Sequence, residues 1–127
     1  LGSLSFAQIS SGDNTIVLPK FKSLKEAMKD MSKKLKVIAA QASDATKNVE
    51  SEQLSTEFMK SVMAAKAFIP DTVKDQNAKD LYEKMMDDSI ALSKQLSESF
   101  HKNENSQAVE MLNKLNQAKK DGHNEFK

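Results

Sequence analysis

Apolar residues recur every three or four positions over most of the chain, which is the spacing of one face of an α-helix. The pattern predicts a helix that begins at Leu24 and three more helices at about residues 52–68, 76–100 and 106–126. Four amphipathic helices with short connections favour an all-α fold, an antiparallel up-down-up-down four-helix bundle. The predicted inward faces are Leu24, Met28, Met31, Leu35, Ile38 and Ala42 in the first helix, Leu54, Phe58, Val62, Ala65 and Ile69 in the second, Ala78, Leu81, Met85, Ser89, Leu92, Leu96 and Phe100 in the third, and Ala108, Met111, Leu112, Leu115, Ala118 and Phe126 in the fourth.

Short polar signals mark the helix ends. Ser23 and Glu26 form an S-x-x-E capping box, in which the hydroxyl and the carboxylate each accept a hydrogen bond from a backbone N–H group that lacks a partner in the helix. Pro70 ends the second helix because its ring is incompatible with a helix interior, and Pro70-Asp71 predicts a turn.

The first part of the chain differs from the rest. Residues 1–19 contain no Lys or Glu and end at Pro19, so we expect them to form an N-terminal arm outside a bundle that occupies residues 20–127. Ser5-Phe6-Ala7 has small residues at the spacing that signal peptidases cleave. The arm is then the remnant of a secretory signal; the alternatives are a disordered tail and a cloning remnant. No stretch approaches the ~20 apolar residues that a membrane span requires.

Composition excludes several kinds of chemistry. A length of 127 residues suffices for one domain. The absence of Cys excludes disulfides, thiolate nucleophiles, iron–sulfur clusters and haem attached through cysteine. The net charge is +1 and the chain contains Lys but no Arg. No guanidinium group is therefore present to form paired hydrogen bonds with a phosphate or with the edge of a base. We therefore do not expect nucleic acid as a partner.

The motifs of enzymes are also missing. The P-loop, Rossmann, nucleophile-elbow and H-E-x-x-H patterns do not occur, so no catalytic residue is predicted. A di-iron site in a four-helix bundle needs two E-x-x-H motifs, but the chain has one, Glu98 to His101, since Lys120 stands where a Glu would have to precede His123. His101 is expected to be a solvated residue at the end of its helix.

His123 and Met28 are the two residues whose positions suggest a site. His123 follows Leu112 by eleven residues, about 1100° of helical rotation, and so shares its face, which points to the core. Met28 lies about 6 Å inside the start of the first helix, as His123 lies inside the end of the fourth, and these two ends are neighbours in an up-down-up-down bundle. A thioether and an imidazole facing each other match axial haem ligation. Taken singly, a lone inward His is more often a hydrogen-bonded core residue, and a Met is more often a core filler.

Here the chain resembles the cytochrome b562 family over about residues 21–127. The resemblance rests on Met28, the segment Leu35-Lys36-Val37-Ile38, Ala108, Leu115 and His123. It implies a small soluble bundle in the periplasm that holds one non-covalent haem b, with Met28 and His123 as axial iron ligands, and that transfers electrons to a partner protein that the sequence does not identify. Residues 119–122 stand where c-type relatives carry Cys-x-x-Cys, so covalent haem is excluded. Candidates for packing against the haem in the third helix are Leu81, Tyr82, Met85 and Met86.

Two other functions remain open from the residues. One is a cofactor-free bundle that acts as a structural or protein-interaction module, which requires only the four apolar faces. The other is a metal-handling protein in which the pairs Met28/Met31 and Met59/Met63 hold Cu(I) through soft thioethers. Both Met pairs also have ordinary core spacing.

Overall fold

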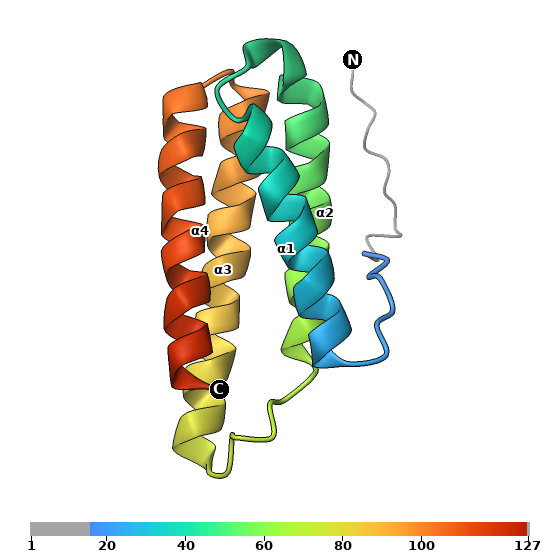
Figure 1. The fold of residues 1–127 in the computed structure, drawn as a ribbon, viewed down its shortest axis with the longest axis vertical. Coiled ribbons are helices and arrows are strands. Elements are labelled where there is room, and N and C mark those ends of the chain that lie inside the picture. Colours follow the sequence, from blue (N-terminus) through green and yellow to red (C-terminus); the bar gives the residue numbers. More distant parts are fainter. Residues whose placement is uncertain (1–15, 127) are drawn as a thin grey trace.

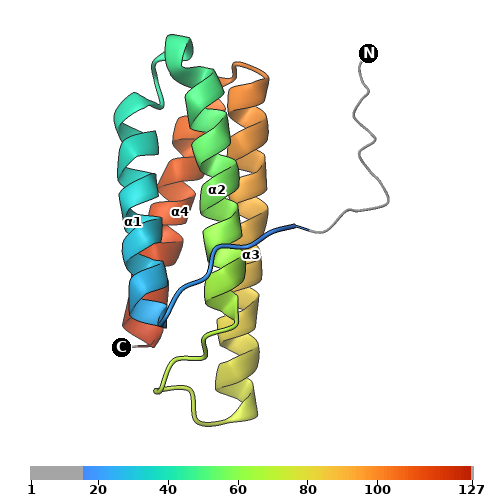
Figure 2. The ribbon, with the colours of Figure 1, turned by 90° about the vertical axis from the view of Figure 1, so that its right-hand side faces the viewer.

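The computed structural model describes residues 16–126, and this part of the chain contains helices and no strand (Figure 1). Helix α1 leans on α2, α2 packs against α3, and α3 packs against α4, while α1 and α4 touch only sparsely. Successive helices run in opposite directions along the long axis (Figures 1 and 2), and the predicted four-helix bundle is confirmed. The helices are α1 (Leu24–Gln41), the 3₁₀ turn η3 (Ala45–Lys47), α2 (Asn48–Lys66), α3 (Gln76–His101) and α4 (Asn105–Glu125).

The start of α1 is capped nearly as the sequence predicts. Ser23 Oγ accepts a hydrogen bond from the Glu26 N–H at 3.2 Å. The reciprocal bond differs, because Glu26 Oε1 accepts from the Lys22 N–H at 2.9 Å rather than from that of Ser23. The carboxylate thus satisfies a backbone donor just outside the helix, where it also interacts favourably with the helix dipole.

The boundaries of α2 differ more from the prediction. The helix begins at Asn48, four residues before residue 52, because Asp44 caps η3 by accepting from the Thr46 N–H and η3 continues directly into α2. It ends at Lys66, ahead of Pro70. The predicted turn is present, since the Val73 N–H donates to Pro70 O at 3.0 Å.

One end of the bundle is closed by a group of asparagines. Asn48, which is buried, donates to the side-chain oxygens of Asn103 and Asn105 at 2.8 and 3.1 Å. Asn105 in turn donates to Ala42 O at 2.7 Å, which ties the end of α1 to the start of α4. Asn103 has a φ of 58°, a left-handed conformation that Asn adopts more readily than most residues. All four helices are therefore fastened together at this end.

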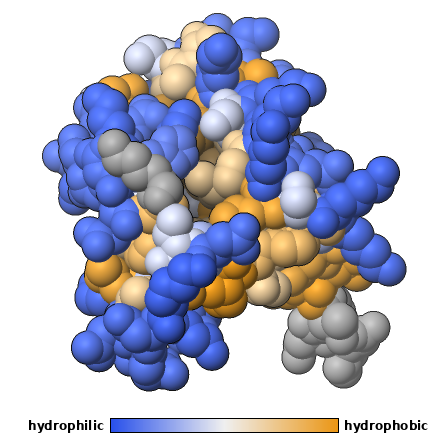
Figure 3. Space-filling model, turned by 60° about the horizontal axis from the view of Figure 1, so that its bottom comes forward, coloured by the Kyte–Doolittle hydropathy of each residue, from blue (hydrophilic) through white to orange (hydrophobic). Residues whose placement is uncertain are grey.

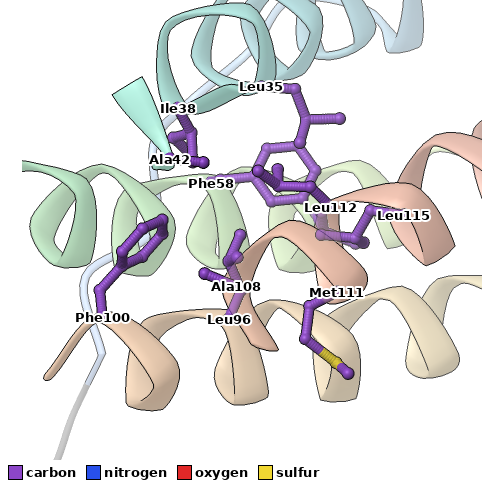
Figure 4. Packing of buried hydrophobic residues seen from close by; sticks show 11 residues of the cluster. Leu35, Ile38, Ala42, Phe58, Leu96, Phe100, Ala108, Met111, Leu112 and Leu115 are labelled. Atoms are coloured by element: carbon purple, nitrogen blue, oxygen red, sulfur yellow. The ribbon is translucent and has the colours of Figure 1, made fainter. Parts of the chain in front are cut away.

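The core lies mostly in the closed half of the bundle. Figure 4 shows Leu35, Ile38 and Ala42 of α1 facing side chains of the other three helices, with Phe58 of α2 among them. The remaining core residues lie toward the C-terminal end of α3 and in the N-terminal half of α4, where they meet the C-terminal half of α1. These are Leu96, Phe100, Ala108, Met111, Leu112 and Leu115, with Val62 of α2.

One residue predicted to face inward at the start of α3 is wrong, because Leu81 is exposed and its neighbour Tyr82 is buried instead. Leu81 is 39% exposed, whereas Tyr82 is 5% exposed. The Tyr82 hydroxyl donates to the carbonyls of Ala65, in the last turn of α2, and of Phe68, just after it, so a hydrogen bond to backbone decides which side chain turns inward. Ile69 is likewise exposed, because α2 ends before it.

The N-terminal arm is described only in part. Of residues 1–19, residues 1–15 and with them Ser5-Phe6-Ala7 lie outside the described range, and residues 16–19 are exposed and not helical. The proposed signal remnant and the division at residues 19 and 20 stay predictions. Within residues 16–126, none of the helices is long and apolar enough to cross a bilayer.

A pair of identical truncations in α3 tests this packing. Leu96→Ala removes a side chain with no exposed surface and should lower the free energy of unfolding by about 2–5 kcal/mol. Leu81→Ala removes the same atoms from the surface and should change it by about 0.5 kcal/mol or less. Urea unfolding of the two variants measures both values, and equal costs would show that Leu81 is a core residue.

Candidate functional site

A cavity of about 250 Å³ opens at the end of the bundle opposite the asparagines. It lies between the N-terminal half of α1, the N-terminal half of α3 and the C-terminal half of α4. Figure 3, which looks toward this end, shows apolar side chains gathered in a hollow with hydrophilic ones around it. The lining residues are Leu24, Met28, Met31, Ser32, Leu35, Phe58, Pro70, Tyr82, Met85, Met86, Ser89, Leu115, Ala118, Lys119, Gly122, His123 and Phe126. We call this space the open-end cavity.

The cavity exists because α1 is held against α2 and not against α4. Ser61 Oγ of α2 donates to Asp30 Oδ2 at 2.6 Å, and Lys34 Nζ forms an ion pair with the same carboxylate at 2.6 Å. Burial acts to raise the pKa of Asp30, but the hydrogen bonds from Lys34 and Ser61 outweigh it, and the pKa lies below its usual value. Because this contact fixes the middle of α1 on α2, the apolar side chains at the start of α1 face space rather than α4.

Met28 and His123 line this one cavity from helices at opposite ends of the sequence. Met28 is half-buried in α1. His123 is exposed on the last turns of α4, and the prediction that it faces a packed core is therefore wrong. The reason is that α4 has no close neighbour on the α1 side at this height, so the His123 ring borders an open space. The structure thus brings the two predicted residues to a common site.

The last turn of α4 is anchored where it carries His123. The Phe126 ring packs edge-on against Tyr82, with ring centroids 5.4 Å apart and an interplanar angle of 87°. Thr72, in the connection between α2 and α3, donates through its hydroxyl to Phe126 O at 3.1 Å. The Phe126 N–H donates to Gly122 O at 3.0 Å and closes the helix. These contacts fix the helical turn that positions His123, and they were not apparent from the sequence because they depend on the path of the α2–α3 connection.

The other candidate residues of the sequence fall into two groups. Tyr82, Met85 and Met86 line the open-end cavity, whereas Leu81 does not. His101 lies in the closed half, exposed, with Nδ1 3.1 Å from Glu52 Oε2.

The two methionine pairs suggested for Cu(I) separate in the same way. Met28 and Met31 line the cavity, but Met59 and Met63 are not among its lining residues. The two pairs therefore do not share this site. Among residues 16–126 no three His, Cys, Asp or Glu side chains form a group that could hold a metal ion.

Comparison with known families agrees with this geometry. The family model described as cytochrome b562 matches residues 23–127, which includes all four helices, Met28 and His123. The chain belongs to the cytochrome b562 family. Members of this family bind haem and carry electrons, and the family is not one of enzymes. No curated protein and no solved structure gives a significant match to the chain.

The lining of the open-end cavity fits the cofactor of the cytochrome b562 family. Most of the lining side chains are apolar, which suits a large flat hydrophobic ring. The only imidazole among them is His123, and the thioethers belong to Met28, Met31, Met85 and Met86. One nitrogen donor and one sulfur donor from different helices form a donor set that haem iron accepts.

The Tyr82 hydroxyl gives a test of how the cavity end is held. Burial raises the pKa of Tyr82 from 10.0 to about 12. Between pH 10 and 12 the unfolded chain releases the phenol proton while the folded chain keeps it, so the free energy of unfolding should fall by up to about 2–3 kcal/mol as the pH rises. The decrease begins at the unfolded pKa and ends at the folded pKa.

Tyr82→Phe should remove this part of the alkaline destabilisation. It also removes the hydroxyl donor from the carbonyls of Ala65 and Phe68, which should cost about 1–3 kcal/mol at neutral pH, although Ala65 O still accepts from the Phe68 N–H at 2.9 Å. Urea unfolding of both proteins at neutral and alkaline pH separates the two effects, because the two proteins differ in no other ionisable group. A stability loss in the variant as steep as in the parent would rule out Tyr82 as its source.

Proposed function

We propose that this chain carries electrons by means of one non-covalent haem b held in the open-end cavity, with Met28 and His123 as axial ligands. The observation that carries the proposal is that these two side chains, nearly a hundred residues apart, line one apolar cavity. Family membership supports the cofactor, and the donor set supports the ligands.

Each part of the cavity has a task in this function. The sulfur of Met28 in α1 and an imidazole nitrogen of His123 in α4 would provide a soft and a borderline donor to the iron. The mostly apolar lining would lower the local dielectric constant around the bound group. When bound, haem supplies the reversible one-electron redox chemistry of its iron. Ligation by both side chains would leave no iron position open for a substrate, which suits a carrier rather than an enzyme.

A periplasmic location completes the proposal. The small residues at Ser5-Phe6-Ala7 have the spacing of a signal-peptidase site, and the chain contains no Cys. Haem held without covalent attachment is consistent with this composition, since residues 119–122 offer no thiol.

Substitution of His123 tests the proposed nitrogen ligand. Titration of the parent apoprotein with haemin should give a low-spin visible spectrum that sharpens on reduction. His123→Ala should lose the low-spin bands and bind haem at least about tenfold more weakly. Mutation of a residue that only hydrogen-bonds to a metal ligand already lowers metal affinity by about tenfold or more, and His123 is proposed as the ligand itself. His101→Ala is the matched control and should bind as the parent does, since His101 lies in the closed half. A low-spin spectrum in His123→Ala would favour a cofactor site elsewhere.

Substitution of Met28 tests the sulfur ligand separately. Met28→Ala should still bind haem, become at least partly high-spin and have a lowered reduction potential, because one axial position loses its thioether. Met63→Ala removes an equally half-buried Met that does not line the cavity. It should lower stability without changing the spin state. No haem binding by the parent protein would leave the cofactor-free bundle as the better account.

A further inference from the structure

Charge is distributed unevenly over the helices although the whole chain is nearly neutral. Helix α1 carries five lysines and two carboxylates, whereas α3 carries three lysines and five carboxylates. The net charge of +1 hides this separation. One side of the bundle is therefore basic and another acidic.

The lysines of α1 form a straight row. Lys25, Lys29, Lys33 and Lys36 follow one another at intervals of four, four and three residues, so they share a helix face over about 16 Å. All four are exposed. Within the described part of the chain none of them forms an ion pair, unlike Lys34, Lys66 and Lys84. Their charge is therefore available to a partner.

These lysines border a groove between α1 and α4. The groove is lined by Leu24, Lys25, Met28, Lys29, Ser32, Lys33, Leu35, Lys36, Ala39, Asn116, Lys119 and His123, and it is called the lysine groove below. Among the described residues that line it there are five lysines and no Asp or Glu. Leu35 is buried and Leu24 and Met28 are half-buried, so an apolar floor lies below an exposed cationic rim.

The lysine groove is continuous with the open-end cavity. Met28 and His123 line both, together with Leu24, Ser32, Leu35 and Lys119. A molecule bound in the groove would therefore lie directly beside the two proposed haem ligands. Electron exchange requires such proximity.

We propose that the lysine groove is the docking surface for an acidic protein, one that presents a protruding segment rich in Asp and Glu. Complementary charge would steer its approach and speed association at low ionic strength. A concave site suits a protruding chain segment, whereas a lipid surface is better matched by apolar side chains that stand above the lysines. The absence of Arg disfavours nucleic acid. Electron exchange with this partner rests on the proposed function. The docking itself rests only on the shape and charge of the groove.

The test uses the apoprotein, so it does not depend on haem. A synthetic oligoglutamate peptide is titrated into ¹⁵N-labelled protein at ionic strengths of about 0.01 and 0.15 M. Shift changes should concentrate at residues 24–39 and 116–123, and binding should weaken at the higher salt. Changes centred on α2 or α3 would overturn the proposal.

Two charge-matched variants separate the groove from net charge. The quadruple substitution Lys25→Gln, Lys29→Gln, Lys33→Gln and Lys36→Gln should weaken peptide binding by about tenfold or more. Lys79→Gln, Lys94→Gln, Lys102→Gln and Lys114→Gln remove the same charge from exposed lysines outside the groove and should weaken it less than about twofold. Equal losses would mean that only net charge matters and would overturn the proposal.

Three further measurements fix the class of partner. Phosphatidylglycerol vesicles or a DNA duplex that binds more tightly than the peptide, with the same dependence on the groove lysines, would replace the protein partner with a lipid or a nucleic acid. Loss of peptide binding on haem loading would show that the lysines serve the carboxylates of the cofactor instead. The groove variant should keep the haem spectrum of the parent, because none of its four lysines lines the open-end cavity.

Discussion

The attachment of α1 decides where this bundle is closed and where it is open. The Ser61–Asp30–Lys34 contact holds the middle of α1 on α2, and Asn105 ties its last turn to α4. Taken over its whole length, α1 packs against α2 and has little contact with α4. A four-helix bundle packed evenly along its length would bury the methionines of α1 and α3 against one another. Here they border a cavity that the chain does not fill with its own side chains.

That opening brings the start of α1 and the end of α4 to one cavity. The first turns of α1 contribute Met28, and the last turns of α4 contribute His123. Tyr82 and Thr72 hold Phe126, so the terminal turn of α4 is supported by α3 and by the α2–α3 connection. None of these three residues is among those that line the lysine groove. At the end of α4, Phe126 holds the helix in place, while Lys119 and His123 line the lysine groove.

The helical period made much of this predictable. The start of α1, the length of α3 and the inward positions of Ile38, Leu96 and Leu112 follow from apolar spacing and a capping serine. Leu81 was wrongly assigned to the inward face, because the buried position of its neighbour Tyr82 depends on backbone carbonyls at the end of α2, which no local pattern records. The early start of α2 depends on a 3₁₀ turn that an apolar pattern cannot show.

The sequence predicted that Met28 and His123 lie near each other, but it did not predict the open cavity that they line. Counting turns placed Met28 and His123 at one end of the bundle, and the structure puts both on one cavity. The same counting assigned His123 to a packed core, because periodicity assumes that every inward position is covered by a neighbour. The lysine groove also required the fold, since Lys119 of α4 and the lysine row of α1 line one groove only when the two helices flank the same space.

The most direct test of the account follows the seven methionines by NMR as haem is added. With ¹³C-labelled methyl groups, the Met28 methyl should show the largest ring-current shift in the reduced protein. Smaller shifts are expected for Met31, Met85 and Met86, which line the open-end cavity, and none for Met59, Met63 and Met111, which do not. Large shifts confined to that last group, or an unshifted Met28, would contradict a haem held between Met28 and His123.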